Sequence, residues 1–203
     1  MRKLLIATQN KGKQKEIRAL LGGLTVEFIT PDQINLEPDI LEDGETYKEN
    51  ATKKATTYAM AAAEITGMLT LADDSGLEVD VLDGQPGLHS ARFSKKPGAT
   101  DADRRAFLLD KIINYPRPWT ARFRCVVVLH DPGSGLHFSE GICSGKIIPE
   151  ERGDNGFGYD PIFLMEDLNR TMAELTIDEK NRLSHRARAV HAIKPILAEI
   201  LKR

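Results

Sequence analysis

The sequence predicts an α/β fold with a mixed β-sheet, and three observations lead to this prediction. Short apolar runs with strand spacing alternate along the chain with segments whose apolar residues recur at helical spacing. Two strand-like runs flank the turn sequence 131–135, which is typical of an antiparallel hairpin. The 203 residues are 41% hydrophobic, and no repeat, linker or low-complexity tract divides them. We therefore expect a single domain, residues 1–203, built as one core or as two closely joined lobes.

The first half of the chain alternates strands with helices. We expect strands at 3–8, 26–30, 68–72 and 77–81, and helices at 13–21 and 46–67. Gly22 and Gly23 stop the first helix. Thr46 and Glu49 open the second helix as a capping box, and Gly67 ends it. Alanines along one face of this second helix would allow it to lie close to a sheet.

The second half adds the hairpin and three helices. In order, we expect a helix of about three turns opened by Thr100 and Asp103, hairpin strands at 121–130 and 136–144 with a further strand at 146–148, a short helix capped by Thr176 and Glu179, and a terminal helix capped by Ser184 and kinked at Pro195. The hairpin makes at least part of the sheet antiparallel.

The segment Asp73-Asp74-Ser75-Gly76 is the most informative short stretch. It follows an apolar strand-like run, and successive strand residues point to opposite faces, so two carboxylates buried side by side require a turn. Gly76 would supply that turn. A buried carboxylate also requires a cation or hydrogen-bond donors. Because the same composition suits an exposed turn between strands, the segment alone leaves a binding site and a plain turn open.

Charge and composition exclude several classes of function. The chain has 28 Lys and Arg against 30 Asp and Glu, a formal net charge of −2, so it offers no basic field for nucleic acid and any anion site must be local. The apolar stretch behind the N-terminus is too short for a signal peptide, and none approaches membrane-spanning length. We expect a cytoplasmic protein without a membrane partner. Cys125 and Cys143 are expected to be core thiols, with a cross-strand disulfide as the alternative.

A candidate anion site follows the first strand. The segment reads Thr8-Gln9-Asn10-Lys11-Gly12-Lys13. Its position before a helix, where backbone N–H groups and the helix dipole favour an anion, suits a phosphate. It matches neither a Walker A loop nor a Rossmann glycine pattern, and a plain polar connector is the alternative. Lys53 or Lys54, on the next helix, would point either to this site or to solvent.

A candidate metal site involves the acidic loop before the second helix. Glu42 lies there among other acids that would ordinarily face solvent. If this loop returns to Asp73 and Asp74, the two segments supply oxygen ligands for Mg²⁺, and substrate phosphates and water would complete the octahedron.

Two segments near the C-terminus could recognise a base. Phe157 lies between glycines in the loop 153–161, which exposes the ring as a stacking platform, although a mobile surface loop is the alternative. Ser184, His185 and Arg186 begin the last helix and offer donors to a base edge or a phosphate. The adjacent Ser and His, without a nucleophile elbow, exclude a hydrolase triad.

In this order the segments resemble those of a known family. The matching motifs are Thr8-x-Asn10-x-x-Lys13, Glu49-Asn50-Ala51, Lys54-Ala55, Ala72-Asp73-Asp74-Ser75-Gly76-Leu77, Pro86-Gly87, Ser90-Ala91-Arg92, Phe157-Gly158-Tyr159-Asp160-Pro161 and Ser184-His185-Arg186. Each motif is weak, but the ordered set is specific and spans essentially the whole chain. The chain closely resembles the inosine/xanthosine triphosphate pyrophosphatases, the noncanonical purine NTP pyrophosphatases also called Ham1-like proteins.

The resemblance implies an elongated, twisted mixed sheet flanked by helices, with two lobes and a nucleotide cleft between them, usually in a homodimer. It also implies Mg-dependent hydrolysis of ITP, dITP and XTP to the monophosphate and pyrophosphate, which cleanses the nucleotide pool. A Maf-like pyrophosphatase is disfavoured because that family has Ser-x-Ser-Pro-Arg-Arg after its first strand. A nonenzymatic nucleotide-binding regulator would typically have lost an acid such as Asp74, which this chain keeps.

The resemblance further implies roles for individual residues. Asp74 would activate the attacking water, and Glu42 and Asp74 would hold Mg²⁺. Substrate would be bound by Thr8, Gln9, Asn10, Lys11, Gly12, Lys13, Lys54, Ser75, Phe157, Gly158, Tyr159, Asp160, Lys180, His185 and Arg186. Within this set, Phe157 would stack on the base, and Asp160, Lys180, His185 and Arg186 would contact its edge or lie beside it.

Overall fold

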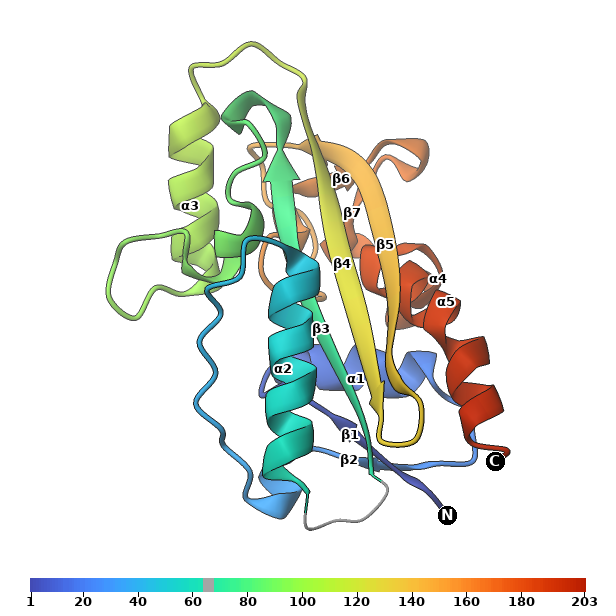
Figure 1. Ribbon diagram of the computed structural model, residues 1–203. Coiled ribbons are helices and arrows are strands. Elements are labelled where there is room, and N and C mark those ends of the chain that lie inside the picture. The colour runs from blue at the N-terminus through green and yellow to red at the C-terminus, as the bar shows by residue number, and fades with distance from the viewer. Residues whose placement is uncertain (64–67) are drawn as a thin grey trace. The chain divides into compact units, whose positions relative to one another are not determined.

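The fold is an open mixed β-sheet flanked by helices, which confirms the predicted fold class (Figure 1). A computed structural model describes residues 1–63 and 68–203. Its strands form a seven-stranded sheet in the order β2-β1-β3-β4-β5-β6-β7. Strand β1 pairs in parallel with both β2 and β3, whereas β6 pairs antiparallel with β5 and β7.

The strands and helices have the following bounds. The strands are β1 (Lys3–Ile6), β2 (Glu27–Ile29), β3 (Leu69–Val79), β4 (Trp119–Asp131), β5 (Gly135–Ile147), β6 (Phe163–Met165) and β7 (Arg170–Thr171). The α-helices are α1 (Lys11–Leu20), α2 (Tyr47–Ala61), α3 (Asp101–Ile112), α4 (Ile177–Leu183) and α5 (His185–Ile200). The predicted hairpin is β4 and β5, and β5 continues without a break into the segment predicted as a further strand.

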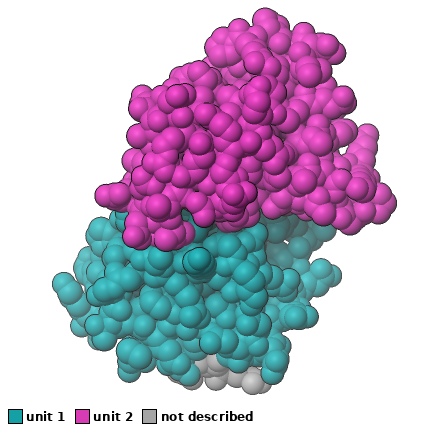
Figure 2. All heavy atoms as spheres, turned by 180° about the vertical axis from the view of Figure 1, so that it is seen from behind, with its two compact units in different colours: residues 1–74, 125–141, 185–203 teal, residues 75–124, 142–184 magenta. Residues whose placement is uncertain are grey.

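The chain divides into two compact units (Figure 2). Unit 1 comprises residues 1–74, 125–141 and 185–203, and unit 2 comprises residues 75–124 and 142–184. The single domain with a nucleotide cleft between its lobes stays a prediction.

In unit 1, helices cover both faces of the sheet (Figure 1). Helices α1 and α5 pack on one face of β1, β3 and β4, where the buried apolar residues include Leu4, Ile6, Ile17, Leu71, Val127 and Ile193. A Cβ placed on Gly141 of β5 would lie 2.2 Å from the backbone oxygen of His185, so glycine is required for this close approach of α5. Helix α2 lies on the opposite face, with Ala51 and Ala55 fully buried.

In unit 2, α3 packs against a second apolar core. Its members include Leu77, Leu108, Ile112, Trp119, Phe123, Ile162 and Phe163. The Trp119 indole N–H donates to the backbone oxygen of Tyr115, so the largest buried side chain of this core keeps its polar atom satisfied. Cys125 and Cys143 are free, buried thiols, as the first of the two alternatives predicted.

Strand β3 corrects the sequence prediction of two strands separated by a turn. It runs unbroken through Asp73, Asp74 and Gly76 to Val79. No turn is needed because the alternation of the strand sends the two carboxylates to opposite faces, where each meets its own cation. The predicted turn at Asp83 and Gly84 does form, with φ of 50° and 84°.

Helix ends differ from the prediction in three places. Helix α1 begins at Lys11 rather than Lys13, because the Asn10 side chain caps it. Helix α2 ends at Ala61, and Gly67, its predicted end, lies outside the described residues. The Thr46 side chain caps α2 as expected, but the Glu49 carboxylate accepts from the backbone N–H of Glu45, so the predicted capping box is only half formed. The boxes that open α3 and α4 are confirmed.

Candidate functional site

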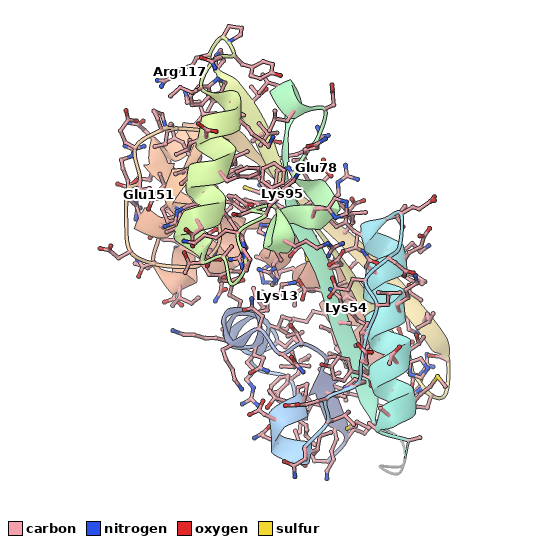
Figure 3. All side chains as sticks on the ribbon, turned by 90° about the vertical axis from the view of Figure 1, so that its left-hand side faces the viewer. Lys13, Lys54, Glu78, Lys95, Arg117 and Glu151 are labelled. Atoms are coloured by element: carbon pink, nitrogen blue, oxygen red, sulfur yellow. The ribbon has the colours of Figure 1, made fainter. Side chains whose placement is uncertain are left out.

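Two clusters of buried charge lie on opposite faces of β3 in unit 1. Asp73 is 1% exposed and Asp74 is 6% exposed. Because neighbouring strand residues face opposite ways, Asp73 points toward α1 and α5, while Asp74 points toward α2. Figure 3 labels one lysine of each cluster, Lys13 on α1 and Lys54 on α2. The strand thus separates two adjacent carboxylates into different electrostatic environments.

The Asp73 cluster consists of Asp73, Lys13, Arg186 and Glu16. Asp73 Oδ2 lies 3.0 Å from Lys13 Nζ and accepts two hydrogen bonds of 3.1 Å from Arg186. Arg186 also donates from NH1 to Glu16 at 2.6 Å. Burial alone would raise the pKa of Asp73, but the charges of Lys13 and Arg186 outweigh it and hold that pKa below its ordinary value. Near neutral pH, Asp73 is therefore a charged counter-ion to Lys13 and Arg186.

The Asp74 cluster consists of Asp74, Lys54, Glu42 and Asn50. Lys54 Nζ lies 2.8 Å from Asp74 Oδ1 and 3.1 Å from Glu42 Oε1. Asn50 donates from its side chain to Asp74 Oδ2 at 3.4 Å and accepts from the backbone N–H of Gly44, which fixes the start of α2 beside the carboxylate. Two acids and one lysine from three separate segments therefore converge.

The electrostatics of this second cluster differ from those of the first. Burial raises the pKa of Asp74 above its ordinary value, against the opposing charge of Lys54, and the nearby Glu42 raises it further. Burial alone would lower the pKa of Lys54, but Asp74 and Glu42 together raise it. Asp74 shares the nearby ammonium of Lys54 with a second carboxylate, and its raised pKa makes it a better proton acceptor than Asp73.

The segment 8–13 forms the connection that follows β1 and the first turn of α1. Asn10 Oδ1 accepts from the backbone N–H of Lys13 at 3.0 Å, and Thr8 Oγ1 accepts from the backbone N–H of Asn10 at 3.2 Å. Gln9 is exposed, and Gly12 lies in the first helical turn. Lys13 reaches Asp73, whereas Lys11 pairs with Asp32 at the surface and is not brought to the acids.

The donor set around Asp74 fits a hard cation held only partly by protein. Among residues 1–63 and 68–203, no group of three or more His, Cys, Asp or Glu side chains is close enough to hold a metal ion. Two carboxylates, Glu42 and Asp74, do converge on the single ammonium of Lys54. Mg²⁺ is commonly held by one or two carboxylates together with substrate phosphates and water, so this pair is compatible with it.

In unit 2, the Phe157 loop, residues 153–160, presents a half-buried aromatic ring. The Phe157 backbone N–H donates to Asp160 Oδ2 at 2.9 Å. Lys180 of α4 donates to the same oxygen at 2.6 Å, and its Nζ lies 5.0 Å from the centre of the Phe157 ring. A Cβ on Gly156 would lie 2.1 Å from that oxygen, and its φ is 80°. Glycine is therefore required there on both steric and conformational grounds.

The remaining predicted residues fall into different surroundings. Ser75 is half-buried and follows Asp74 in β3. The Tyr159 side chain is buried and donates to the backbone oxygen of Ser90, and burial raises its pKa. His185 is 4% exposed at the start of α5. His185 and Arg186 belong to unit 1 and Asp160 and Lys180 to unit 2, so their meeting at one base stays a prediction.

The contacts of Arg186 are not those of a side chain that reads the edge of a base, which is the role that the family resemblance implies. Its guanidinium is 1% exposed, and all three of its nitrogens donate to Asp73 or Glu16. A sequence shows that a guanidinium is available but not which carboxylates the fold brings to it. These contacts indicate a role in neutralising the Asp73 cluster.

Four residues that contact predicted site residues were not predicted from the sequence. Glu16 carries no signal, because a charged residue on a polar helix is ordinarily exposed, yet it is 4% exposed and paired with Arg186. Asn50 could have been found, since it lies inside a motif that carries the family resemblance. Asp101 and Arg105 of α3, which contact Gly158, lie outside every motif.

The chain is similar in sequence to known proteins over most of its length. Residues 4–196 match the model of the Ham1 family. A dITP/XTP pyrophosphatase of Desulforamulus reducens is 44% identical over 196 residues, which cover 96% of this chain and 95% of that protein. Another, from Geobacter sulfurreducens, is 45% identical over 195 residues and covers 96% of each chain.

A solved structure shows the same fold. A HAM1 protein from Coxiella burnetii superposes with a TM-score of 0.85 at 39% identity, over 98% of this chain and 100% of that one. The likeness in fold therefore extends over nearly the whole length of the chain.

Proposed function

The chain belongs to the Ham1 family, and from that premise we propose that it hydrolyses ITP, dITP and XTP to the monophosphate and pyrophosphate. Its enzyme class is that of hydrolases acting on the anhydride bonds of nucleoside triphosphates. Removal of these noncanonical purine nucleotides would cleanse the nucleotide pool. The single observation that carries the proposal is the convergence of Glu42 and Asp74 on Lys54 in unit 1, the unit that also contains the N-terminus of α1.

The triphosphate is bound by unit 1. The N-terminal turn of α1 supplies backbone N–H groups from the segment 8–13, and its dipole favours an anion. Lys13 and Lys54 add positive charge. Since both lysines are paired with carboxylates, an incoming phosphate meets ammonium groups that are already held in place.

The chemical step depends on Asp74. Its buried carboxylate, with a raised pKa, is suited to accept a proton from the water that attacks the α-phosphorus. Glu42 and Asp74 would hold Mg²⁺ together with phosphate oxygens, and the ion would neutralise phosphate charge and lower the pKa of bound water. The charge of Lys54 favours the charged, acceptor form of Asp74 against the effect of burial. Activity therefore rises with pH through the range in which Asp74 loses its proton.

The base is bound by unit 2. The Phe157 ring stacks on a purine, and the Asp160–Lys180 pair beside it supplies polar groups for the base edge. Hypoxanthine and xanthine present a 6-oxo acceptor, whereas adenine presents an amino donor, so a donor such as Lys180 favours the former.

Several expectations of the family accompany this proposal. We expect a homodimer, a cytoplasmic location and no nucleic-acid partner. Within the part of the chain that the structure describes, no helix has the length and apolar character needed to cross a membrane. The Ham1 match supports this family over a Maf-like pyrophosphatase, and the retained Asp74 favours an enzyme over a nonenzymatic regulator.

The test is a product assay on the purified chain with a nucleotide panel and Mg²⁺. ITP, dITP and XTP are expected to yield pyrophosphate and a monophosphate, and EDTA is expected to abolish turnover. Release of orthophosphate and IDP from ITP would contradict the proposed bond specificity. Full turnover in EDTA would contradict the proposed requirement for a metal ion.

A further inference from the structure

Helix α3 holds the backbone of the Phe157 loop at Gly158. The Gly158 N–H donates to Asp101 Oδ2 at 2.8 Å, and the Gly158 carbonyl oxygen accepts from Arg105 NH1 at 2.8 Å. Asp101 and Arg105 are four residues apart, so they occupy the same face of the helix. Both polar backbone groups of one glycine are therefore bound by charged side chains of one helix. Gly158 has a φ of 64°, a conformation that few other residues adopt.

The two α3 side chains are themselves oriented by other charges. Glu151 accepts from Arg105 Nε and NH2, both at 2.8 Å, in a bidentate pair (Figure 3 labels Glu151). This pairing leaves NH1 for Gly158, and a lysine could not reproduce it. On the other side, Arg104 NH1 donates to Asp101 Oδ1 at 2.5 Å. The arrangement fixes the direction of both contacts to Gly158.

The contacts at Gly158 complete a chain of restraints on Phe157. Its backbone N–H donates to the Asp160 carboxylate, and its carbonyl oxygen accepts from the Asp160 N–H at 3.3 Å. The peptide groups on both sides of the aromatic residue are thus held by unit 2 itself. The backbone that carries the ring cannot shift at Phe157 N–H or at Gly158 unless a hydrogen bond to a charged group breaks, and such bonds are about twice as strong as neutral ones.

We propose that Asp101 and Arg105 are positioning residues that hold the Phe157 ring where a purine stacks, and that they thereby set the selectivity for the base. This inference rests on the proposed function of the Phe157 loop. Edge groups discriminate between bases only when the base lies in one place, and a displacement of about 1 Å is enough to lose much of an oriented interaction. Neither residue touches the substrate, and both act through Gly158.

The kinetic test is a double-mutant cycle between Arg105→Lys and Phe157→Ala. Arg105→Lys keeps the charge but loses the bidentate geometry, and we expect it to raise KM for ITP roughly tenfold, to leave kcat within about threefold, and to narrow the preference for ITP over ATP. In the Phe157→Ala background it should add less than about twofold, because the group through which it acts is gone. Additive losses would overturn the proposal. Lys111→Ala, on the last turn of the same helix, is the matched control.

A second readout does not depend on activity. Amide hydrogen exchange in residues 153–160 should accelerate roughly tenfold or more in Arg105→Lys and in Asp101→Asn, and should stay unchanged in Lys111→Ala. Unchanged exchange in both Arg105→Lys and Asp101→Asn would overturn the positioning role. If the native chain hydrolysed no ITP, the proposed function would fail, while the exchange rates would still decide whether α3 holds the loop.

Discussion

The Asp73 cluster of unit 1 and the Phe157 loop of unit 2 use charged side chains for different purposes. In unit 1, charged side chains from two helices pair with a carboxylate on a strand, so the fold holds charged side chains against one another. In unit 2, the carboxylates of Asp101 and Asp160 accept from backbone N–H groups, so charge is used to shape a loop. The difference indicates a division of labour, in which changes in unit 1 affect turnover and stability and changes in the Phe157 loop affect binding of the base.

The largest effect is expected on the face of β3 that carries Asp74. Asp74→Asn removes the proton acceptor and one proposed metal ligand with little change of shape, and turnover of ITP should fall by about 10²- to 10⁴-fold. The measurement is pyrophosphate release under saturating substrate. Asp43→Asn, in an exposed carboxylate paired with Lys53, is the control and should retain activity. If a folded Asp74→Asn enzyme kept nearly normal turnover, Asp74 would not be the proton acceptor, and Glu42 would be the next residue to test.

A change on the opposite face should act on stability instead. Arg186→Ala leaves Asp73 and Glu16 without the guanidinium that neutralises them, and breaking a buried pair in this way costs about 3–5 kcal/mol. Urea unfolding measures the loss, and Arg188→Ala, at an exposed position of the same helix, should cost much less. Equal stability of the two variants, together with a narrowed preference for ITP over ATP, would restore Arg186 as a reader of the base edge.

A smaller effect concerns the pH dependence of stability. The pKa of Asp73 is lower in the folded chain than its ordinary value of about 3.9. The contribution of Asp73 to the free energy of unfolding is therefore fully present above about pH 3.9 and is lost as the pH falls through the folded pKa. The difference in free energy of unfolding between the native chain and Asp73→Asn should therefore be constant near neutral pH and shrink below about pH 4. Urea unfolding across this range checks the sign, and a difference that grows in acid would contradict it.

Part of this arrangement could be predicted from the sequence. The alternation of apolar runs predicted the mixed sheet, and the pairs Thr100/Asp103 and Thr176/Glu179 predicted two helix starts, because these signals are local. The course of β3 could not be predicted in the same way. Asp-Asp-Ser-Gly has turn composition, and only the cations that tertiary structure brings to each face allow it to continue as a buried strand.

The candidate site shows the same limit. The residue types around Asp74 were identified from motifs, but the partners of Arg186 were not, because its contacts to Glu16 and Asp73 lie 170 and 113 positions away in the chain. Asp101 and Arg105 were missed for a related reason. They contribute through the backbone of Gly158, and a contact to a backbone group leaves no pattern in the sequence.

The most direct test of the division of labour compares kcat and KM for ITP in Asp74→Asn and in Phe157→Ala. Asp74→Asn should lower kcat by about 10²-fold or more and leave KM within about threefold. Phe157→Ala should raise KM roughly tenfold, as expected for the loss of base stacking, and leave kcat within about threefold. If Phe157→Ala instead lowered kcat as far as Asp74→Asn did, with KM unchanged in both, the separate roles assigned to the two units would be contradicted.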